Sequence, residues 1–400
     1  MSLASRATTV LRGLRARGGS SVMILVVALV AVAAATVGPS YDEAARTSIV
    51  RDTVANAGVL GRGFSVVQTG PVSNTLPLLE SEVRQALPSG SGNEVQGLFQ
   101  PPIESIEATA VDPALSGPIP LDWRSGVCSQ LQLAGACPTS PNQVIISASF
   151  AKVAGWGIGQ RLSLPGPLVL TVTGIYQAPR QSDDYWFNRQ LTYFPYEYPQ
   201  ASGPRGPPVA VYDAMFTTEA TLSGESPDVQ GTLTYNDLLA PVNIQAKDVG
   251  PLSQAMTSMV NSTALQAVQA IPTSDIPATM ASVTAAWSSL AVPIFLITIE
   301  VLSLAWLLLF VLITEAVTVR GADVALAKLR GYGRSRSVAL AVSEPVTLLI
   351  AAFPLGALAG WGAAVALARV LLVHGTPVAL SGLGWAAAAG STAGGFVAVV

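Results

Sequence analysis

The chain has 400 residues, of which half are hydrophobic and only 11% are charged, with a net charge of −3 and a mean hydropathy of +0.49. This composition excludes an ordinary soluble domain and predicts a membrane protein whose apolar runs cross the bilayer. Membrane lipid is therefore an expected partner, and nucleic acid is not.

The chain begins with a basic tail that is followed by an apolar run. Residues 1–20 contain four arginines and no acidic residue, and no charge occurs between Gly18 and Tyr41. Arginine close to a membrane span resists translocation, so this tail is expected in the cytoplasm. The small residues Ala33–Ala35 resemble a signal-peptide cleavage site, but the apolar core exceeds the usual length of about 7–15 residues. We therefore favour a retained membrane anchor over a cleaved signal peptide.

Residues 38–290 form the expected external segment, with 11 Lys+Arg, 20 Asp+Glu and a net charge of −9. This sign is opposite to that of the expected cytoplasmic segments, so charge and hydropathy indicate the same topology. The length suits one large or two small globular domains of mixed α+β structure. Pro39 is expected to end the first span. The expected helices cover residues 41–58 (a separate stalk), 74–87, 248–268 and 276 onward, and the expected strands cover residues 64–68, 143–146, 168–176, 209–212 and 231–235.

The only two cysteines, Cys128 and Cys137, both lie in this external segment. Extracytoplasmic compartments are oxidising, so we expect a disulfide that closes the short loop between them. The alternative is two separate buried thiols. Metal binding is not expected, because the single histidine, His374, follows the third apolar run and the chain has no other cysteine pair.

The sequence lacks the common catalytic motifs. Each of the three lysines follows alanine, whereas a phosphate-binding P-loop requires Gly-Lys-Ser/Thr, and neither HExxH nor GxSxG occurs. A Ser-His-Asp triad would have to use His374. The adjacent residues Asp183 and Asp184 are interpreted as solvated loop carboxylates. We therefore expect no enzyme activity, no catalytic residue, no bound cofactor and no metal on this chain.

Two further apolar runs are long enough to cross a bilayer, because a helical span needs about 20 apolar residues. Leu290–Ile313 contains 24 residues with the single charge Glu300, and Pro345–Ala368 contains 24 residues without a charge. A fourth apolar run begins near Trp385 and is still apolar at Val400. This pattern predicts an incomplete fourth span and a sequence that is truncated at its C-terminal end.

Two features of these runs predict helix packing. Gly356 and Gly360 form a GxxxG pattern that allows close helix approach, and we favour packing within the same subunit over dimerisation. Glu300 lies near the middle of the second span, where a charge is costly, so it is expected to face the interior of the helix bundle. A structural hydrogen bond to a neighbouring helix is favoured over a polar path, because a proton relay needs several such residues.

The segment from Glu315 to Arg336 links the second and third spans and carries five cationic and two acidic residues. This charge predicts a cytoplasmic loop. Residues 322–329 (ADVALAKL) are expected to form a short amphipathic helix, which is a candidate docking surface for a protein partner. The alternative is a helix that lies on lipid headgroups, with its Lys and Arg at the phosphates.

The external stretch Asn142–Gln177 resembles the periplasmic core domain of MacB-type permeases. The pattern there is a strand, a short helix that ends in a Gly-containing turn, Gly-Gln or Gly-Asp, and a β-hairpin that closes on Val-x-Gly-hydrophobic-Tyr. Ser147 can cap the helix, and Gly157 with Gly159 permits the turn. The corresponding segments are Val144–Ile146, Ser147–Ala154, Gly159–Gln160 and Val172–Tyr176.

The cytoplasmic loop resembles that of the FtsX-like permease domain. That family has basic residues after a span, a helix of the type E-hydrophobic-A-L-x-x-hydrophobic-R-G, and a Glu that opens the next span. Asp323 replaces the commoner Glu, which is a conservative change at a helix N-terminus. The order of elements, the N-terminal tail and the cysteine pair resemble the large actinobacterial members of this group of ABC transporter permeases. The matching residues are Arg320, Asp323–Leu326, Leu329–Gly331 and Glu344.

The resemblance implies a mechanism and a set of partners. Such permeases form a homodimer, or a pseudo-dimer with a second permease half, and sit on a separate ABC ATPase subunit that binds ATP and Mg. The loop helix enters a groove of that ATPase, and ATP-driven closure moves the spans and the extracytoplasmic domain. On this chain the resemblance places the apolar contact residues in the groove and Arg330 at its rim. The implied ATPase-docking residues are Asp323, Val324, Leu326, Leu329 and Arg330.

The expected architecture is an α-helical transmembrane bundle in the cell membrane, with the N-terminus in the cytoplasm and a large α+β domain of MacB type between spans 1 and 2. The expected function is that of a permease subunit that couples ATP hydrolysis by its partner to motion of the external domain, in mechanotransmission or export. The alternative is a membrane-anchored sensor or scaffold without an ATPase, which purification of the native complex would distinguish. The expected segments are the tail 1–20, span 1 at 21–38, the external domain 39–288, span 2 at 289–314, the coupling loop 315–340, span 3 at 341–370, a short external loop 371–384 and the incomplete span 4 at 385–400.

Overall fold

The structure is a computed structural model of the chain. It divides into two compact units, unit 1 (Met1–Asp52 and Val283–Val400) and unit 2 (Thr53–Ser282). The residues that it describes are 18–72, 75–87, 95–111, 118–163, 168–177, 184–189, 200–201, 208–209, 212–224, 230–319, 329, 334–373, 375–380 and 382–399.

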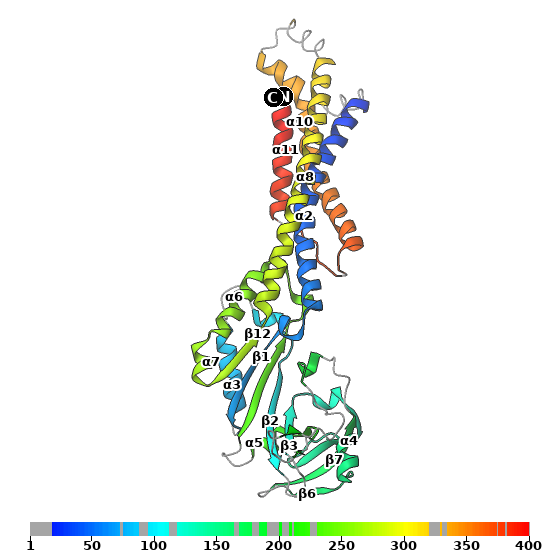
Figure 1. The fold of residues 1–400 in the computed structure, drawn as a ribbon. Coiled ribbons are helices and arrows are strands. Elements are labelled where there is room, and N and C mark those ends of the chain that lie inside the picture. The colour runs from blue at the N-terminus through cyan, green and yellow to red at the C-terminus, as the bar shows by residue number, and fades with distance from the viewer. Residues whose placement is uncertain are drawn as a thin grey trace. The chain divides into compact units, whose positions relative to one another are not determined.

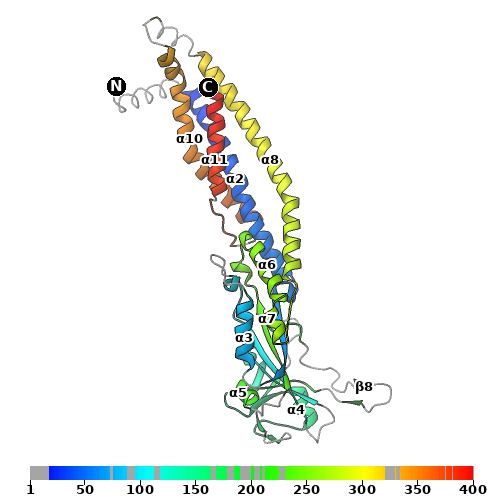
Figure 2. The ribbon, with the colours of Figure 1, turned by 90° about the vertical axis from the view of Figure 1, so that its left-hand side faces the viewer.

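The described residues of unit 1 lie mainly in four long helices, which Figures 1 and 2 show side by side. Three of them are long and apolar enough to cross a membrane, over Val22–Asn56, Ile276–Glu315 and Val346–Leu371. Within the unit, buried alanines and glycines let the helices pack closely, as Ala352 and Ala357 illustrate with no exposed surface. The helices are α2 (Gly18–Asn56), α8 (Ile276–Val319), α10 (Arg334–Leu371) and α11 (Gly382–Val399).

The expected break at Pro39 is wrong, because α2 continues through this proline as a single helix of 39 residues. A proline inside a helix removes one backbone hydrogen bond, the one to the carbonyl four residues earlier. Membrane helices tolerate this loss where neighbouring helices pack around the site. Here Ala35, Thr36 and Ser40 are all buried beside the proline. The first span and the expected stalk are therefore one helix, and α8 likewise runs through Pro293.

Unit 2 is built on a mixed sheet whose described strands follow the order β12-β1-β11-β2-β3-β10-β5-β7-β4, with β6 paired to β7. The pairs β10–β3 and β5–β7 are parallel, and the other pairs in this sheet are antiparallel. The strands are β1 (Gly63–Pro71), β2 (Ile103–Val111), β3 (Pro118–Arg124), β4 (Gln132–Gly135), β5 (Gln143–Ser147), β6 (Arg161–Ser163), β7 (Val169–Gln177), β10 (Met215–Thr217), β11 (Gln230–Leu238) and β12 (Ala270–Ser274), with the separate pair β8 (Gln200–Ala201) and β9 (Pro208–Val209).

Short helices cover this sheet. Helices α3, α6 and α7 pack at the end formed by β12, β1 and β11, whereas α5 packs on β2 and β3 and α4 packs on β5 and β7. The helices are α3 (Thr75–Ala86), α4 (Ala148–Ala154), α5 (Glu219–Ser223), α6 (Val249–Val260) and α7 (Thr263–Ala267). The 3-10 turns are η1 (Val59–Gly61), η2 (Val95–Leu98), η3 (Val127–Gln130), η4 (Asp184–Trp186), η5 (Pro241–Asn243) and η6 (Ala246–Asp248).

Aromatic side chains form several groups in the described core of unit 2. Near the β1–β11 pair, the Phe64 ring lies 5.3 Å from the Phe99 ring and 6.1 Å from the Tyr235 ring, measured between centroids. On the β5–β10 side, Trp186 and Phe216 are fully buried in a second cluster. Trp186 comes from η4, outside the sheet, so this short turn contributes one of the largest side chains of the core.

Four of the five expected strands are present as β1, β5, β7 and β11. In the expected strand over 209–212, Val209 ends β9 and Tyr212 is not in a strand, whereas residues 210–211 lie outside the described residues. The expected single helix over 248–268 is divided into α6 and α7. The division follows from local chemistry, because Ser262 leaves the helical conformation and its Oγ accepts the N–H of Leu265 as an N-cap. Strands β2, β3, β4, β10 and β12 were not expected.

Candidate functional site

The expected ATPase contact falls almost entirely outside the described residues. Asp323, Val324, Leu326 and Arg330 are not described, so their proposed roles stay predictions. Leu329 is the exception, and its side chain is 85% exposed. The docking role of Leu329 stays a prediction as well.

The GxxxG pair of α10 lies against α2 within unit 1. A Cβ added at Gly356 would stand 2.7 Å from Cβ of Val32, and one added at Gly360 would stand 2.6 Å from the carbonyl oxygen of Ala33. Such distances exclude a side chain at either glycine unless the helices separate. Ala364 continues the same face with no exposed surface. In this structure the glycines therefore serve packing within one chain.

Glu300 does not face the helix bundle, contrary to our expectation. Its side chain is exposed on α8, whereas Ala305, Leu309 and Ile313 of the same helix are buried. Thr298 also faces inward, because a Cβ added at Gly38 of α2 would stand 2.8 Å from its Oγ1. The carboxyl group therefore projects away from the other described helices of unit 1.

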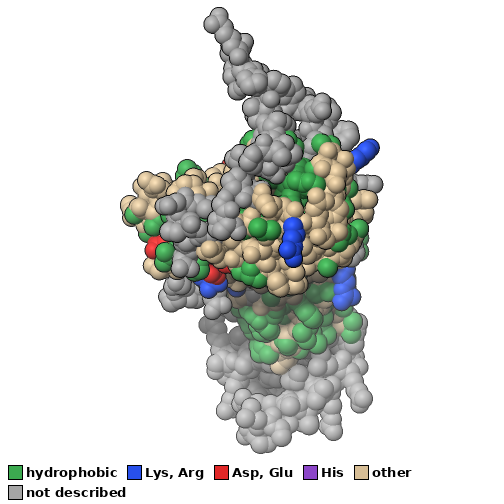
Figure 3. Space-filling model, turned by 90° about the horizontal axis from the view of Figure 1, so that it is seen from below, with side chains coloured by type: hydrophobic (Ala, Val, Ile, Leu, Met, Phe, Trp, Pro, Cys, Tyr) green, Lys and Arg blue, Asp and Glu red, His purple; other side chains and the backbone are tan. Residues whose placement is uncertain are grey.

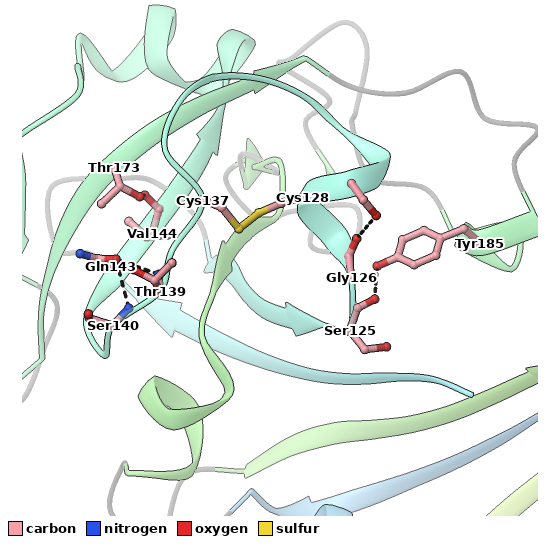
Figure 4. The surroundings of a disulfide bond; sticks show 11 residues. Ser125, Gly126, Cys128, Cys137, Thr139, Ser140, Gln143, Val144, Thr173 and Tyr185 are labelled. Carbon is pink, nitrogen blue, oxygen red and sulfur yellow. Dashed lines mark hydrogen bonds between the residues drawn. A yellow bond between two sulfur atoms is a disulfide. The ribbon is translucent and has the colours of Figure 1, made fainter. Parts of the chain in front are cut away.

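The two cysteines of unit 2 form the expected disulfide (Figure 4). Cys128 lies in η3 and Cys137 follows the edge strand β4, and their Cα atoms are 6.0 Å apart. Strand β4 approaches β7 so closely that a Cβ at Gly135, whose φ is +103°, would stand 2.6 Å from the Thr173 carbonyl oxygen. The disulfide therefore fixes the last strand of the sheet to the buried cluster around Trp186, against which Cys128 packs.

A buried polar network joins strands β2 and β3 to the segment that follows η4. Asp122 on β3 has no exposed surface, and its Oδ2 accepts a hydrogen bond of 2.6 Å from Nη2 of Arg189. The same guanidinium forms an ion pair of 2.8 Å with Glu107 on β2. Oδ1 of Asp122 has no hydrogen-bond partner among the described residues. Arg189 is therefore a cross-link between two strands and a segment distant in sequence.

A second arginine extends this network. Arg124 on β3 is buried. Its guanidinium lies over the Tyr185 ring, 4.9 Å from the centroid, and over the Trp186 ring, 5.8 Å from the centroid. It also donates a hydrogen bond to the backbone oxygen of Tyr185. The Tyr185 hydroxyl donates in turn to the Ser125 carbonyl oxygen at 2.7 Å. Stacking on aromatic faces suits a guanidinium that burial has partly desolvated. The turn η4 is thus held on the sheet by its backbone and by both of its aromatic rings.

Burial shifts the ionisation of these groups. Desolvation raises the pKa of Asp122 to about 7, although the Arg189 charge opposes the shift. Desolvation also lowers the pKa of Arg124 to about 10 and raises the pKa of Tyr185 to about 12. On β11, desolvation raises the pKa of Asp237 to about 7, against one hydrogen bond from the Leu238 N–H. Asp122 and Asp237 are therefore groups that titrate near neutral pH inside the fold.

The network corrects one sequence interpretation. Asp184 is not merely a solvated loop carboxylate, because it forms an ion pair with Arg62, which precedes β1, while Asp183 lies outside the described residues. Sequence reasoning also missed Asp122, Arg124 and Arg189, since nothing local distinguishes a charge that will be buried from one on the surface. The one available signal was Trp186, an aromatic residue in a polar segment.

The stretch that resembles a MacB-type core has the expected local geometry in its helix. Ser147 caps α4, because its Oγ accepts the N–H of Phe150 at 2.9 Å, and it also donates to the buried carboxylate of Asp213. The turn after α4 uses Gly155 and Gly159, with φ of +69° and +88°, whereas Gly157 is not in the left-handed region.

None of these groups forms a catalytic arrangement within the described part of the chain. No set of three or more His, Cys, Asp and Glu side chains there could hold a metal ion. On the face seen in Figure 3, the described basic side chains stand singly and form no continuous patch. The buried polar network of unit 2 is a structural connection, and the features that point to function are the membrane helices and their two links to the sheet.

No protein-family model and no curated protein sequence matches this chain. Solved structures that are similar to it include the following two. One is a domain assigned to a permease protein of Porphyromonas gingivalis, with 10% identity over 54% of this chain and 88% of that chain and a TM-score of 0.27. The other is the periplasmic region of MacB from Actinobacillus actinomycetemcomitans, with 10% identity over 56% of this chain and 94% of that chain and a TM-score of 0.30. Similarity at this level does not define a family or a function.

Proposed function

We propose that this chain is the membrane-spanning permease subunit of an ABC transporter complex, which couples ATP hydrolysis on a separate ATPase to motion of an extracytoplasmic domain. The observation that carries this proposal is the order of the two units along the chain. Unit 2 occupies Thr53–Ser282, and the helices at its two ends, α2 and α8, are both candidate membrane spans. A domain with both ends on membrane helices can respond to movement of those helices.

The charge distribution supports an extracytoplasmic position for unit 2. The segment 38–290 carries a net charge of −9, whereas the preceding tail has four arginines and no acidic residue. Basic residues mark the cytoplasmic ends of spans. The same orientation places the basic segment Glu315–Arg336 in the cytoplasm. The disulfide between Cys128 and Cys137 agrees with an oxidising compartment for unit 2.

Inside unit 2, the two chain ends are joined at one edge of the sheet. Strand β1, which follows α2, pairs with β12, which precedes α8. The Asp275 N–H donates to the Leu60 carbonyl oxygen at 2.9 Å, and the Ser274 hydroxyl donates to the Gly63 carbonyl oxygen at 3.0 Å. A displacement of α2 relative to α8 must therefore act directly on the β1–β12 pair, and through β1 on the remaining sheet.

The energy for such motion must come from a partner. The sequence has no P-loop, so ATP and Mg are expected on the ATPase subunit and not on this chain. The cytoplasmic loop between α8 and α10 is the proposed contact. There Val324, Leu326 and Leu329 would enter an apolar groove, Arg330 would lie at its rim, and Asp323 would begin the loop helix. This assignment rests on the resemblance to FtsX-like permeases.

The experiment is the double substitution Leu326→Asp with Leu329→Asp in the full chain. Native complexes are first purified from membranes to identify the ABC ATPase that accompanies the wild-type chain. Two charges in an apolar contact should reduce ATPase recovery at least roughly tenfold, because a buried unpaired charge costs several kcal/mol. Stimulation of ATP hydrolysis by the permease should fall with it.

The matched control is Lys328→Ser, which lies in the same loop but outside the proposed contact. It should leave ATPase recovery and ATP hydrolysis unchanged. The docking proposal is wrong if the double variant inserts into the membrane and still recovers and stimulates the ATPase. A wild-type complex that contains no ATPase would instead support a membrane-anchored sensor or scaffold.

A further inference from the structure

The segment 184–189, formed by η4 and the three residues after it, joins parts of the sheet that are not neighbours. Asp184 pairs with Arg62, which directly precedes β1, and Arg189 pairs with one carboxyl group on β2 and one on β3. Strand β11 lies between β1 and β2 in the sheet. We call residues 184–189 the η4 latch. The latch therefore links the start of β1 to β2 and β3 by side chains, in addition to the backbone pairing through β11.

The closed latch contains strained and desolvated groups. Phe187 and Asn188 have a left-handed backbone, with φ of +48° and +57°, which is unfavourable for residues other than glycine unless the surroundings hold it. Nε1 of Trp186 and Oδ1 of Asp122 are buried and have no hydrogen-bond partner among the described residues. Opening would relieve the backbone and give both atoms access to water. Strain and desolvation thus oppose closure, so the latch is suited to open separately from the rest of the fold.

Protonation acts on the latch at a pair of carboxyl groups that Arg189 contacts. Glu107 on β2 and Asp122 on β3 stand directly opposite each other, and both pair with this one guanidinium. Arg124 on β3 also acts on Asp122, and Tyr185 of the latch lies against Arg124. Burial outweighs the attraction of Asp122 to both arginines and raises the pKa of Asp122 to about 7. The closed latch therefore favours the protonated form of this carboxyl group.

We propose that the η4 latch opens as the pH rises through neutrality and that its opening releases β2 and β3 from the start of β1. Opening hydrates the Asp122 carboxyl group, so its pKa falls toward the ordinary value of 3.8. The closed state binds this proton more tightly, so closure is favoured at low pH and weakens as the pH rises through about 7. Between about pH 6 and about pH 8, the ratio of open to closed latch should rise roughly tenfold.

This inference deepens the proposed function. A closed latch would pass a displacement of β1 directly to β2 and β3, whereas an open latch would leave only the backbone pairing through β11. The response of the latch to pH needs no ATPase, so it is measured independently of the proposed coupling.

The experiment is amide hydrogen exchange on the full chain in detergent at about pH 6 and about pH 8, with each rate corrected for the intrinsic exchange rate at that pH. The reporters are the N–H groups of Phe187 and Arg189, which donate to the carbonyl oxygens of Asp184 and Trp186 at 3.2 and 2.8 Å. Their protection should be roughly tenfold lower at the higher pH. Protection of the β2–β3 ladder should be retained, which shows that the sheet stays folded.

Three variants separate the groups involved. Asp122→Asn keeps an oxygen for Arg189 but cannot titrate, so its latch should be equally protected at both pH values. Asp237→Asn is the matched control, because burial also raises the pKa of Asp237 to about 7 but its carboxylate accepts the Leu238 N–H on β11. It should retain the tenfold change in latch protection. Arg189→Gln removes the shared cation and should lower latch protection roughly tenfold at both pH values.

Several outcomes overturn the inference. These are wild-type latch protection that is unchanged or increases with pH, a pH response that persists in Asp122→Asn or disappears in Asp237→Asn, and equal protection in Arg189→Gln and the wild type. Parallel loss of protection in the β2–β3 ladder also overturns it, because the whole sheet would then be opening. A latch that fails to respond while the ATPase is recovered contradicts only this inference. A latch that responds in a chain that recovers no ATPase contradicts only the proposed function.

Discussion

The two units of this protein differ in the side chains that they expose. On α8 of unit 1, the exposed side chains are large and apolar, and the buried positions include Ala305. Elsewhere in the interior of unit 1, small hydroxyl residues such as Thr36 and Ser391 are buried. Unit 2 has aromatic rings such as Phe64 and Trp186 in its interior. One chain is thus organised for two solvents, because lipid gives no hydrophobic advantage to burying a leucine and water does.

The two units also differ in the surroundings of their carboxyl groups. In unit 2, Asp122 is buried and shares Arg189 with Glu107, and burial outweighs this ion pair and raises the pKa of Asp122 to about 7. In unit 1, Glu300 is exposed on an apolar helix and has no such arginine near it in the sequence of its span. The first carboxyl group is paired within its own domain, whereas the second points away from the other described helices of unit 1. The following experiments test whether the two units differ in these ways.

The largest effect is expected from Trp186→Ala, which removes a fully buried indole from the core of unit 2. Removing a buried aromatic side chain costs about 3–5 kcal/mol, because it leaves a cavity that the surroundings fill only partly. Thermal unfolding of the full chain in detergent should show a lower midpoint for unit 2. Trp287→Ala is the matched variant in unit 1, where the indole N–H donates to the Arg46 carbonyl oxygen at 3.2 Å. It should leave the midpoint of unit 2 unchanged, and an equal shift would contradict two separate cores.

The second effect concerns the disulfide, which links residues nine positions apart. Replacing both cysteines, Cys128→Ser with Cys137→Ser, should destabilise unit 2 by about 2–3 kcal/mol in the chain-entropy treatment of a short loop. Adding a reductant to the wild-type chain should lower the unfolding midpoint of unit 2 and leave that of unit 1 in place. The double variant serves as the control, since the reductant should not change it. A reductant effect that persists there would exclude the disulfide as its cause.

The third effect belongs to unit 1. Gly360→Val places a side chain against the backbone of α2, where its Cβ would stand 2.6 Å from the Ala33 oxygen. Overpacking of this kind costs about 1–3 kcal/mol. Gly362→Val is the matched control on the same helix, because nothing lies within 4 Å of its added Cβ. Resistance of α10 to proteolysis in detergent should fall for the first variant only. Equal resistance of both variants would show that α2 and α10 do not depend on this contact.

Sequence reasoning recovered the elements whose signals are local. Long apolar runs predicted the candidate spans, and alternating apolar residues predicted β1, β7 and β11. It missed β2 and β3, because IESIEATAV carries two glutamates and β3 begins and continues with prolines. Their strand state comes from pairing with each other and with β11, which no local pattern records. The prediction at Pro39 was wrong for the same reason, because the residues that pack around α2 belong to other helices.

The candidate site shows the same limit. The sequence shows the GxxxG spacing of Gly356 and Gly360, and it shows that Glu300 is a polar residue in an apolar run. It does not show on which side of α8 Glu300 lies. Whether a residue on a helix is buried or exposed depends on which face of that helix the other helices cover. Likewise, Asp122 and Arg189 are 67 positions apart, and only the folded sheet brings them together.

The smallest effect tests the buried carboxyl group of Asp122 in unit 2 through its pH dependence. The pKa of Asp122 is raised by burial from 3.8 to about 7, so the folded state holds this proton more tightly than the unfolded state. The stabilising contribution is fully present below about pH 3.8 and is lost as the pH rises through about 7. Asp237 has the same direction and a similar pKa, so the two groups act in one window.

Asp122→Asn keeps the shape of the side chain and an oxygen for Arg189, but it cannot titrate. The variant should therefore lose part of the fall in unfolding free energy between pH 5 and pH 8, on the order of 1 kcal/mol, while Asp237 maintains the rest. The measurement is the unfolding midpoint of unit 2 across this range. Asp237→Asn is the companion variant, which should retain the Asp122 part of the slope and lose the other part. An unchanged slope in Asp122→Asn would mean that Arg189 compensates the Asp122 charge fully, and that Asp237 alone accounts for the pH dependence.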